Sequence, residues 1–172
     1  MSREWKLEIT KEGGIPIENP KFHCEVVTKE VQLVGQSITA NFPQHFPDAA
    51  LQIQTQFVKR RHEITNAKNQ EVLFSPYMCN GIFATYFACL EVEDLSIVPE
   101  GMIGFKLPST TYAKINCTTK SIGEAYPKLF GWMQEHGYHQ KLLDHSCPME
   151  IYYFEENVEE EQVELLIPIK EK

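Results

Sequence analysis

The stretch EVLFSPYMCNGIFATYFACLEVE, residues 71–93, decides the fold. It predicts two strands, over 71–79 and 82–93, because both parts are rich in aromatic and β-branched residues. The Asn-Gly dipeptide at 80–81 predicts a tight hairpin between them, since both residues of such a turn need positive φ. Pro76 predicts that the first strand lies at a sheet edge or carries a bulge, because proline donates no ladder hydrogen bond.

N-terminal to this stretch, apolar residues at helical spacing predict a helix over 47–63. These residues are Ala50, Ile53, Phe57 and Ile64. Before that helix, the β-branched and partly alternating segment 23–39 predicts a long strand, with Gly35 as a bulge or a point of close approach. Residues 1–22 contain several glycines and prolines and form a lead-in with one short strand expected at 5–9.

Toward the C-terminus the same order of elements repeats. The expected elements are an extended segment at 102–118, a helix at 122–136 and strands at 148–155 and 162–170. Ser121 and Glu124 have the spacing of a capping box at the start of this helix. The expected helix starts, Pro47 and Ser121, lie 74 residues apart (121 − 47).

The repeated order predicts an α+β fold made of two βαββ halves related by a pseudo-twofold axis, with antiparallel sheets, about eight strands and two main helices. We expect one domain over 23–172, with halves at about 23–98 and 99–172. The halves should pack together, because one helix on a small sheet makes a thin core.

Composition excludes several classes of protein. The chain has 172 residues, 42% of them hydrophobic, and a net charge of −8. These values fit a globular domain, and an acidic balance argues against direct binding of nucleic acid. No apolar run reaches the roughly 20 residues of a membrane span, and the N-terminus lacks a signal-peptide core, so we expect a cytoplasmic protein. The five cysteines form no CxxC pair, which argues against a disulfide framework or a zinc ribbon.

Four pieces of the second half occur in a familiar order, and a fifth piece comes from the first half. They are GFKLPSTTYAKI (104–115), SIGEAYPKLFGWMQEHGY (121–138), MEIYYF (149–154), ELLIPIK (164–170) and LVGQSITANF (33–42). Together they resemble the GyrI-like family, also called the AraC-type or multidrug-regulator effector-binding domain. The resemblance spans most of residues 24–170 and implies two halves around a central ligand pocket.

The resemblance also implies a function. In that family a buried glutamate on the fifth strand, flanked by aromatic residues, receives cationic or aromatic ligands, and Glu150 is the matching residue. Some members are fused to a DNA-binding helix-turn-helix, whereas this chain resembles the stand-alone form. Some stand-alone relatives are hydrolases that open strained cyclopropane rings of genotoxic compounds. Others bind drugs, or bind and protect DNA gyrase.

The residues around Glu150 support a buried site on their own. In a strand, Glu150 shares one face with Tyr152 and Phe154. Both faces are apolar or aromatic apart from this glutamate, so the strand should be covered on both sides. A carboxylate held there can recruit a cation or act as a general base. The alternative is an edge strand on which Glu150 points to water.

Aromatic residues are the expected walls of the pocket, because ring faces hold delocalised cations. The candidates are Tyr86, Phe105, Tyr112, Trp132 and Tyr152. Each has the alternative of being a plain core residue. For Trp132 that alternative is strong, because it lies on the apolar stripe of its helix with Tyr126, Leu129 and Met133.

We therefore expect a small-molecule-binding module for hydrophobic, cationic or planar aromatic compounds, acting as a sensor or a sequestering protein without a cofactor or a metal. One alternative is a hydrolase in which Glu150 deprotonates a water and Tyr86 or Tyr112 hydrogen-bonds to the substrate. Another is a gyrase-modulating interaction module. We interpret the acidic run at 155–164 as a solvated hairpin tip. We interpret the histidines after the second helix as part of a polar loop and not as a metal site.

Overall fold

The computed structural model describes residues 22–142 and 144–170. Within these residues the elements are β1 (Cys24–Asn41), α1 (Asp48–Val58), the short 3-10 helix η1 (Arg61–Glu63), β2 (Val72–Cys79), β3 (Phe83–Glu91), β4 (Ile103–Thr118), α2 (Ile122–Glu135), β5 (His139–Gln140), β6 (Met149–Tyr153) and β7 (Gln162–Lys170). The predicted α+β fold is confirmed. The strand expected at 5–9 lies outside the described residues. No described helix is long and apolar enough to cross a membrane.

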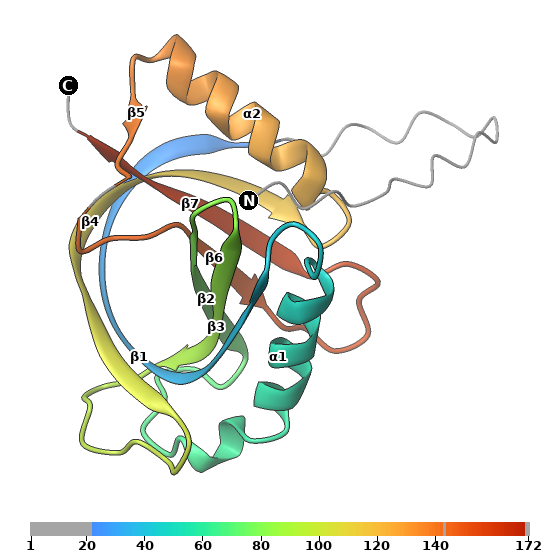
Figure 1. The fold of residues 1–172 in the computed structure, drawn as a ribbon, viewed down its shortest axis with the longest axis vertical. Helices are drawn as coiled ribbons and strands as arrows, with labels where there is room; N and C mark the ends of the chain where they lie inside the picture. The colour runs from blue at the N-terminus through green and yellow to red at the C-terminus, as the bar shows by residue number, and fades with distance from the viewer. Residues whose placement is uncertain (1–21, 143, 171–172) are drawn as a thin grey trace, which may run out of the picture.

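Six antiparallel strands close into a ring (Figure 1). Their order is β4-β1-β3-β2-β6-β7, and β7 also pairs with β4 along residues 162–168, which closes the ring. The two-residue strand β5, which the sequence does not predict, adds to the far end of β7. Because closure leaves the six main strands with partners on both sides, the ring has few unpaired edges.

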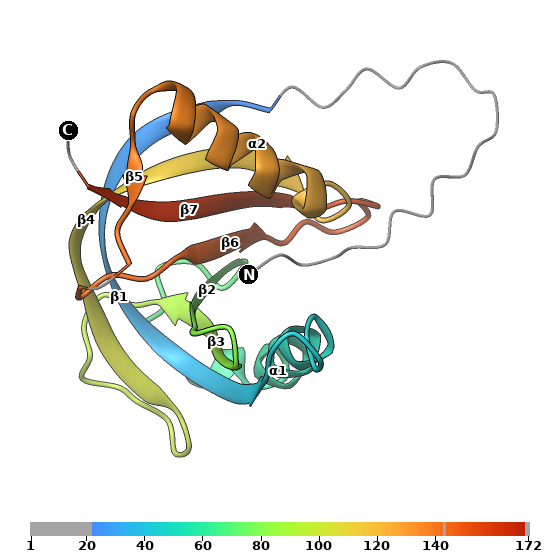
Figure 2. The ribbon, with the colours of Figure 1, turned by 45° about the horizontal axis from the view of Figure 1, so that its top comes forward.

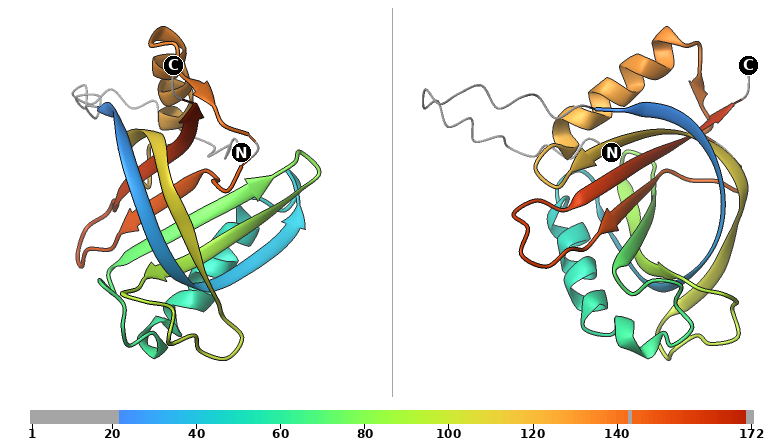
Figure 3. Two further views of the ribbon diagram at one scale, coloured as in Figure 1. Left: turned by 90° about the vertical axis from the view of Figure 1, so that its left-hand side faces the viewer. Right: turned by 180° about the vertical axis from the view of Figure 1, so that it is seen from behind.

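The two predicted halves are visible in the pairing. In the first half β1 pairs with β3 beneath α1, and in the second half β4 pairs with β7 beneath α2. The halves meet along two seams, β1 with β4 and β2 with β6. Figure 3 shows the long strands β1 and β4 running side by side around the ring, with both helices outside it.

Two apolar clusters lie on the two faces of this curved sheet. The outer cluster joins both helices to the sheet and contains the buried residues Ala50, Ile53, Phe57 and Ile64 of the first predicted stripe. The inner cluster contains no helical residue and takes buried side chains from all six ring strands: Val31, Leu33, Phe74, Cys89, Tyr112, Met149, Ile151 and Leu166. The sheet is therefore covered on both faces, and helices cover only the outer one.

The first helix is shorter than predicted. It ends at Val58 instead of Glu63, and the chain continues as the 3-10 turn over 61–63. Arg60 anchors this turn, since its guanidinium donates to both carboxylate oxygens of Glu63, at 2.6 and 3.0 Å, and to the carbonyl oxygen of Glu100 at 2.9 Å.

The hairpin of the opening stretch forms, but its turn is wider than predicted. Only Gly81 adopts positive φ, at 86°, and Cys79 pairs with Ala84, so the loop has four residues. The side-chain oxygen of Asn80 accepts the N–H groups of Ile82 and Phe83 at 2.9 Å and closes the loop.

The structure tests the predictions made for two strand positions, Gly35 and Pro76. Gly35 marks a close approach, because a Cβ at this position would lie 2.0 Å from the carbonyl oxygen of Ala88. The edge expected from Pro76 is wrong, since β2 lies between β3 and β6. The paired residues of β2 and β3 instead skip Ser75 and Pro76, which accommodates the missing N–H.

The second helix begins and ends within one residue of the prediction. The capping box is wrong, because Ser121 makes no side-chain bond to the first turn of α2. Its hydroxyl oxygen instead accepts the N–H of Thr118 at 2.9 Å, which ties the end of β4 to the start of the helix.

Candidate functional site

Glu150 lies in the middle of β6 and is completely buried, with 0% of its surface exposed. Figure 2 shows β6 running between the part of the ring covered by α2 and the part covered by α1. Strand alternation puts Glu150 and Tyr152 on the outer, helix-facing side, while Met149 and Ile151 enter the inner cluster. The alternative of an exposed glutamate on an edge strand is therefore wrong.

Three tyrosine hydroxyls donate hydrogen bonds to the Glu150 carboxylate. Tyr86 from β3 and Tyr152 from β6 donate to Oε1, at 2.6 and 2.8 Å. Tyr126 from α2 donates to Oε2 at 2.7 Å. Hydrogen bonds to a carboxylate are stronger than those between neutral groups, so this cluster compensates the loss of hydration around a buried glutamate.

The cluster extends to both helices through further hydroxyl contacts. The hydroxyl groups of Tyr77 and Tyr126 lie 2.9 Å apart, and the rings of Tyr77 and Tyr86 stack with centroids 6.2 Å apart. Gln54 of α1 donates from Nε2 to the Tyr86 hydroxyl at 3.1 Å. One connected polar network thus joins α1, the sheet and α2 in an otherwise apolar layer.

Tyr126 is held in its protonated, donating form. Burial raises the pKa of its hydroxyl well above the ordinary value of 10.0, and the neighbouring Glu150 carboxylate raises this pKa further. At neutral pH Tyr126 therefore remains a hydrogen-bond donor to Glu150.

A pocket of about 390 Å³ opens between α1 and β6, beside the tyrosine cluster. Its lining residues are Gln54, Thr55, Val58, Lys59, Leu73, Thr119, Tyr152, Phe154 and Glu161. Glu150 is not part of this lining. Two lining residues nevertheless touch its cluster, because Tyr152 donates to Glu150 and Gln54 donates to Tyr86.

The pocket wall is aromatic on the side of β6. Phe154 makes a cation–π contact with Arg61, whose guanidinium lies 5.3 Å from the ring centroid. Tyr152 connects the pocket to the buried carboxylate, because it lines the pocket and its hydroxyl donates to Glu150. An apolar hollow with ring faces and a buried negative group beneath them suits a hydrophobic ligand that carries delocalised positive charge.

The structure brings two of the predicted wall residues, Tyr86 and Tyr152, to Glu150. It places the other three elsewhere. Tyr112 belongs to the inner cluster, where burial raises the pKa of its hydroxyl to about 12. Phe105 packs on that same side against Phe87, with ring centroids 5.2 Å apart.

The third of these residues, Trp132, lies at the far end of α2. Its ring stacks on His136 and Tyr138, with centroids 4.5 and 5.6 Å away. Ligand contact by Phe105, Tyr112 or Trp132 stays a prediction, and none of the three lines the pocket between α1 and β6.

Sequence reasoning missed two tyrosines and a glutamine of the network, Tyr77, Tyr126 and Gln54. Tyr126 lies on the predicted helix stripe, where a buried phenol among aliphatic residues signals a polar partner. Tyr77 was missed because it follows Pro76, and this proline predicted a strand at a sheet edge or with a bulge. Gln54 carries no local signal, because its role depends on how α1 packs on β3.

The model of the Cass2 family, described as integron-associated effector binding protein, matches residues 25–169. The chain belongs to the Cass2 family. This confirms the predicted effector-binding family and, at that level, a small-molecule-binding module.

One curated relative of this Cass2 member is the transcriptional regulator BrlR of Pseudomonas aeruginosa. The two are 27% identical over 157 residues, which cover 86% of this chain and 55% of the regulator. The chain thus spans about half the length of that protein.

Two solved structures share the fold of this Cass2 member. The C-terminal domain of EcmrR has a TM-score of 0.65 at 14% identity, covering 89% of this chain and all of that domain. SAV2435, solved bound to tetraphenylphosphonium, has a TM-score of 0.57 at 13% identity, covering 88% of this chain and 94% of that protein.

Proposed function

We propose that this chain binds hydrophobic organic cations in the pocket between α1 and β6, as a cytoplasmic sensor or sequestering protein. The observation that carries the proposal is a fully buried glutamate that is hydrogen-bonded to an aromatic residue of the pocket wall, Tyr152. The acidic group attracts positive charge, and the apolar walls bind the hydrophobic part of the ligand.

Tyr152 connects the two parts of the proposed site. It lines the pocket and donates to Glu150 at 2.8 Å. A cation on its ring face would gain about 0.5–2 kcal/mol from the contact, depending on how far it is desolvated. The hydrogen bond to a carboxylate increases electron density on the phenol and strengthens that attraction.

The known relatives support this ligand class. SAV2435 was solved with tetraphenylphosphonium, a cation whose charge is shielded by four aromatic rings. BrlR is a transcriptional regulator, and a role of this chain in transcription regulation or drug resistance is part of the proposal.

The geometry favours binding over hydrolysis. A general base needs a lone pair within hydrogen-bond reach of the water that it deprotonates. Three tyrosine hydroxyls already donate to the Glu150 carboxylate, and this carboxylate does not line the pocket. A water bound in the pocket would therefore have no direct contact with the proposed general base.

Calorimetric titration tests the proposal with tetraphenylphosphonium and its neutral counterpart triphenylphosphine oxide. We expect the cation to bind wild type at least about tenfold more tightly than the neutral compound, a difference of about 1.4 kcal/mol. Glu150→Gln should remove most of this preference. Val58→Trp should block both compounds, because Val58 lines the pocket and its apolar side chain makes no hydrogen bond to the Glu150 cluster.

Circular dichroism and thermal unfolding of both variants provide the control for folding. The proposal is wrong if wild type binds neither compound. It is also wrong if Val58→Trp, while folded, binds the cation as tightly as wild type does.

A further inference from the structure

The pocket between α1 and β6 has two charged side chains in its own lining, Lys59 and Glu161. Glu150 lies behind Tyr152 and is not one of them. A ligand in the pocket can therefore contact Glu161 and Lys59 directly, whereas it cannot contact the buried Glu150 carboxylate directly.

Glu161 precedes β7, and its backbone is held in place by the turn between β4 and α2. The N–H of Thr119 donates to the carbonyl oxygen of Glu161 at 3.0 Å, and the N–H of Glu161 donates to Thr119 Oγ1 at 3.3 Å. Thr119 also lines the pocket. These reciprocal bonds fix where the Glu161 side chain begins.

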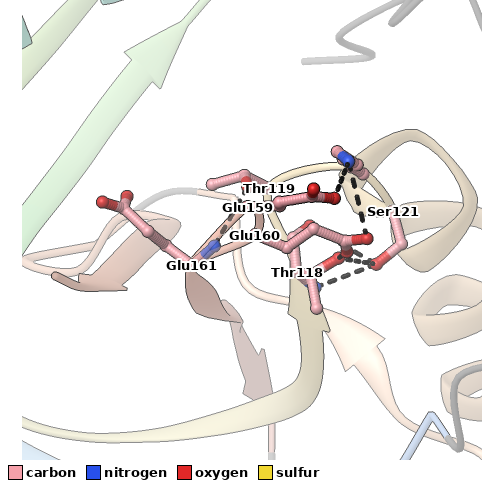
Figure 4. Close-up of polar contacts among 7 residues, drawn as sticks. Thr118, Thr119, Ser121, Glu159, Glu160 and Glu161 are labelled. Carbon is pink, nitrogen blue, oxygen red and sulfur yellow. Dashed lines mark hydrogen bonds and ion pairs between the residues drawn. The ribbon is translucent and has the colours of Figure 1, made fainter. Parts of the chain in front are cut away.

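The two preceding glutamates use their carboxylates to fasten the loop. Glu160 accepts a hydrogen bond from the Thr118 hydroxyl, and Lys120 Nζ lies 3.7 Å from Glu159 and 3.9 Å from Glu160. Figure 4 shows these contacts on one side of the loop, with the Glu161 carboxylate pointing away from them. The nearby lysine is thus engaged by Glu159 and Glu160.

In the part of the chain that the structure describes, the oxygens of the Glu161 carboxylate take part in no ion pair and accept no hydrogen bond. Partial burial raises the pKa of this carboxyl group, because dehydration disfavours its charged form and no donor compensates for it. A cation placed beside it would supply that compensation.

We propose that Glu161 selects the charge of the ligand: it binds the positively charged group of an organic cation at the pocket wall, and Lys59 opposes that binding. This inference rests on the proposed function and assigns the first electrostatic contact to a residue outside the Glu150 cluster. An anionic ligand would reverse both roles.

The acidic hairpin tip has a further role in this arrangement. Thr118, Thr119 and Lys120 hold the loop against the start of α2, so that Glu161 remains at the pocket. The acidic run is then both a solvated tip and one wall of the binding site.

The test compares Glu161→Gln, Lys59→Gln and the matched control Glu159→Gln, titrated with tetraphenylphosphonium and triphenylphosphine oxide. Glu159 is on the same loop, its side chain is 93% exposed, and it does not line the pocket. The control therefore removes the same charge from the loop without changing the pocket.

We expect Glu161→Gln to weaken binding of the cation about threefold to fivefold and Lys59→Gln to strengthen it about twofold, as for partly exposed charge contacts. Glu159→Gln should change it less than about twofold. Binding of the neutral compound should change less than about twofold in all three variants.

The outcomes separate this inference from the proposed function. If wild type binds the cation and Glu161→Gln binds it equally well, or no more weakly than Glu159→Gln does, the assignment of Glu161 is wrong and the pocket proposal stands. If wild type binds neither compound, both are wrong. If Lys59→Gln weakens binding of the cation, the proposed charge selection is reversed.

Discussion

The strands β2 and β6 occupy matching places in the two halves, and only one of them carries a charge. Ser75 and Glu150 are directly opposite each other in this strand pair, and both are fully buried. Two residues further along, each strand has a tyrosine, Tyr77 in β2 and Tyr152 in β6. Glu150 accepts three hydroxyl groups, whereas Ser75 Oγ has no hydrogen-bond partner among the described residues.

The two helices show the same difference between the halves, because only the second helix has a polar group at the matched buried position. The buried positions of α1 recur 76 residues later in α2 (126 − 50), so that Tyr126 corresponds to Ala50. The second half thus supplies both a carboxylate and a hydroxyl donor where the first half has a serine and a methyl group. A symmetric scaffold offers two equivalent positions, and the side chains make only one of them a polar site.

The largest expected effect comes from truncating each member of the central pair. Glu150→Ala leaves three buried hydroxyls without their acceptor and should lower the free energy of unfolding by about 3 kcal/mol or more. Ser75→Ala removes a hydroxyl that has no described partner, so it should change this free energy by less than about 1 kcal/mol. Urea denaturation of both variants measures the difference.

Equal destabilisation by the two substitutions would contradict the proposed asymmetry. Glu150→Gln provides the milder comparison if Glu150→Ala fails to fold, because it keeps the shape of the side chain and one acceptor oxygen. We expect it to fall between the other two variants.

The paired tyrosines should differ in their coupling to Glu150. In double-mutant cycles with Glu150→Gln, Tyr152→Phe should show a coupling energy of about 1–2 kcal/mol, because its hydroxyl bonds to the carboxylate directly. Tyr77→Phe should show a smaller one, since its hydroxyl contacts Tyr126. A larger coupling for Tyr77 would place the centre of the network in the first half.

The smallest effect concerns alkaline stability. Because the pKa of Tyr126 is raised in the folded chain, its contribution to stability is present below about pH 10 and is lost as the pH rises further. Above pH 10 the unfolded phenol ionises while the folded one stays protonated. This difference should lower the unfolding free energy by about 1.4 kcal/mol per pH unit for this one group.

Tyr126→Phe should therefore reduce the slope of stability against pH between pH 10 and 11, although it lowers stability at pH 8. Urea denaturation at pH 8, 10 and 11 measures the slope in wild type and in the variant. An unchanged slope would show that other ionisations cause the alkaline loss.

Much of this fold could be predicted from local sequence signals. Period-two and period-3.6 patterns located the long strands and both helices, and the repeated order indicated the two halves. The wider turn at Asn80 and the early end of α1 could not, because they depend on Asn80 bonding to its own loop and on Arg60 reaching Glu63 and Glu100.

The candidate site was predicted in part for a similar reason. Glu150 and Tyr152 share one face of one strand, which alternation alone reveals. Tyr86 was a candidate because a buried phenol needs a partner, whereas Tyr126 and Gln54 reach the cluster only through helix packing. Glu161 belongs to an acidic run, and the sequence does not show that its loop packs beside the pocket.

The location of a bound cation decides between two cavities that lie beside the paired tyrosines. Tyr152 lines the pocket between α1 and β6, whereas Tyr77 lines a second cavity of about 300 Å³ beside the end of β2. A crystal structure of the chain with tetraphenylphosphonium should show the ion in the first pocket, against Tyr152 and Phe154 and in front of Glu150. An ion seated in the second cavity beside Tyr77, or in neither, would contradict the assignment of the site to the pocket between α1 and β6.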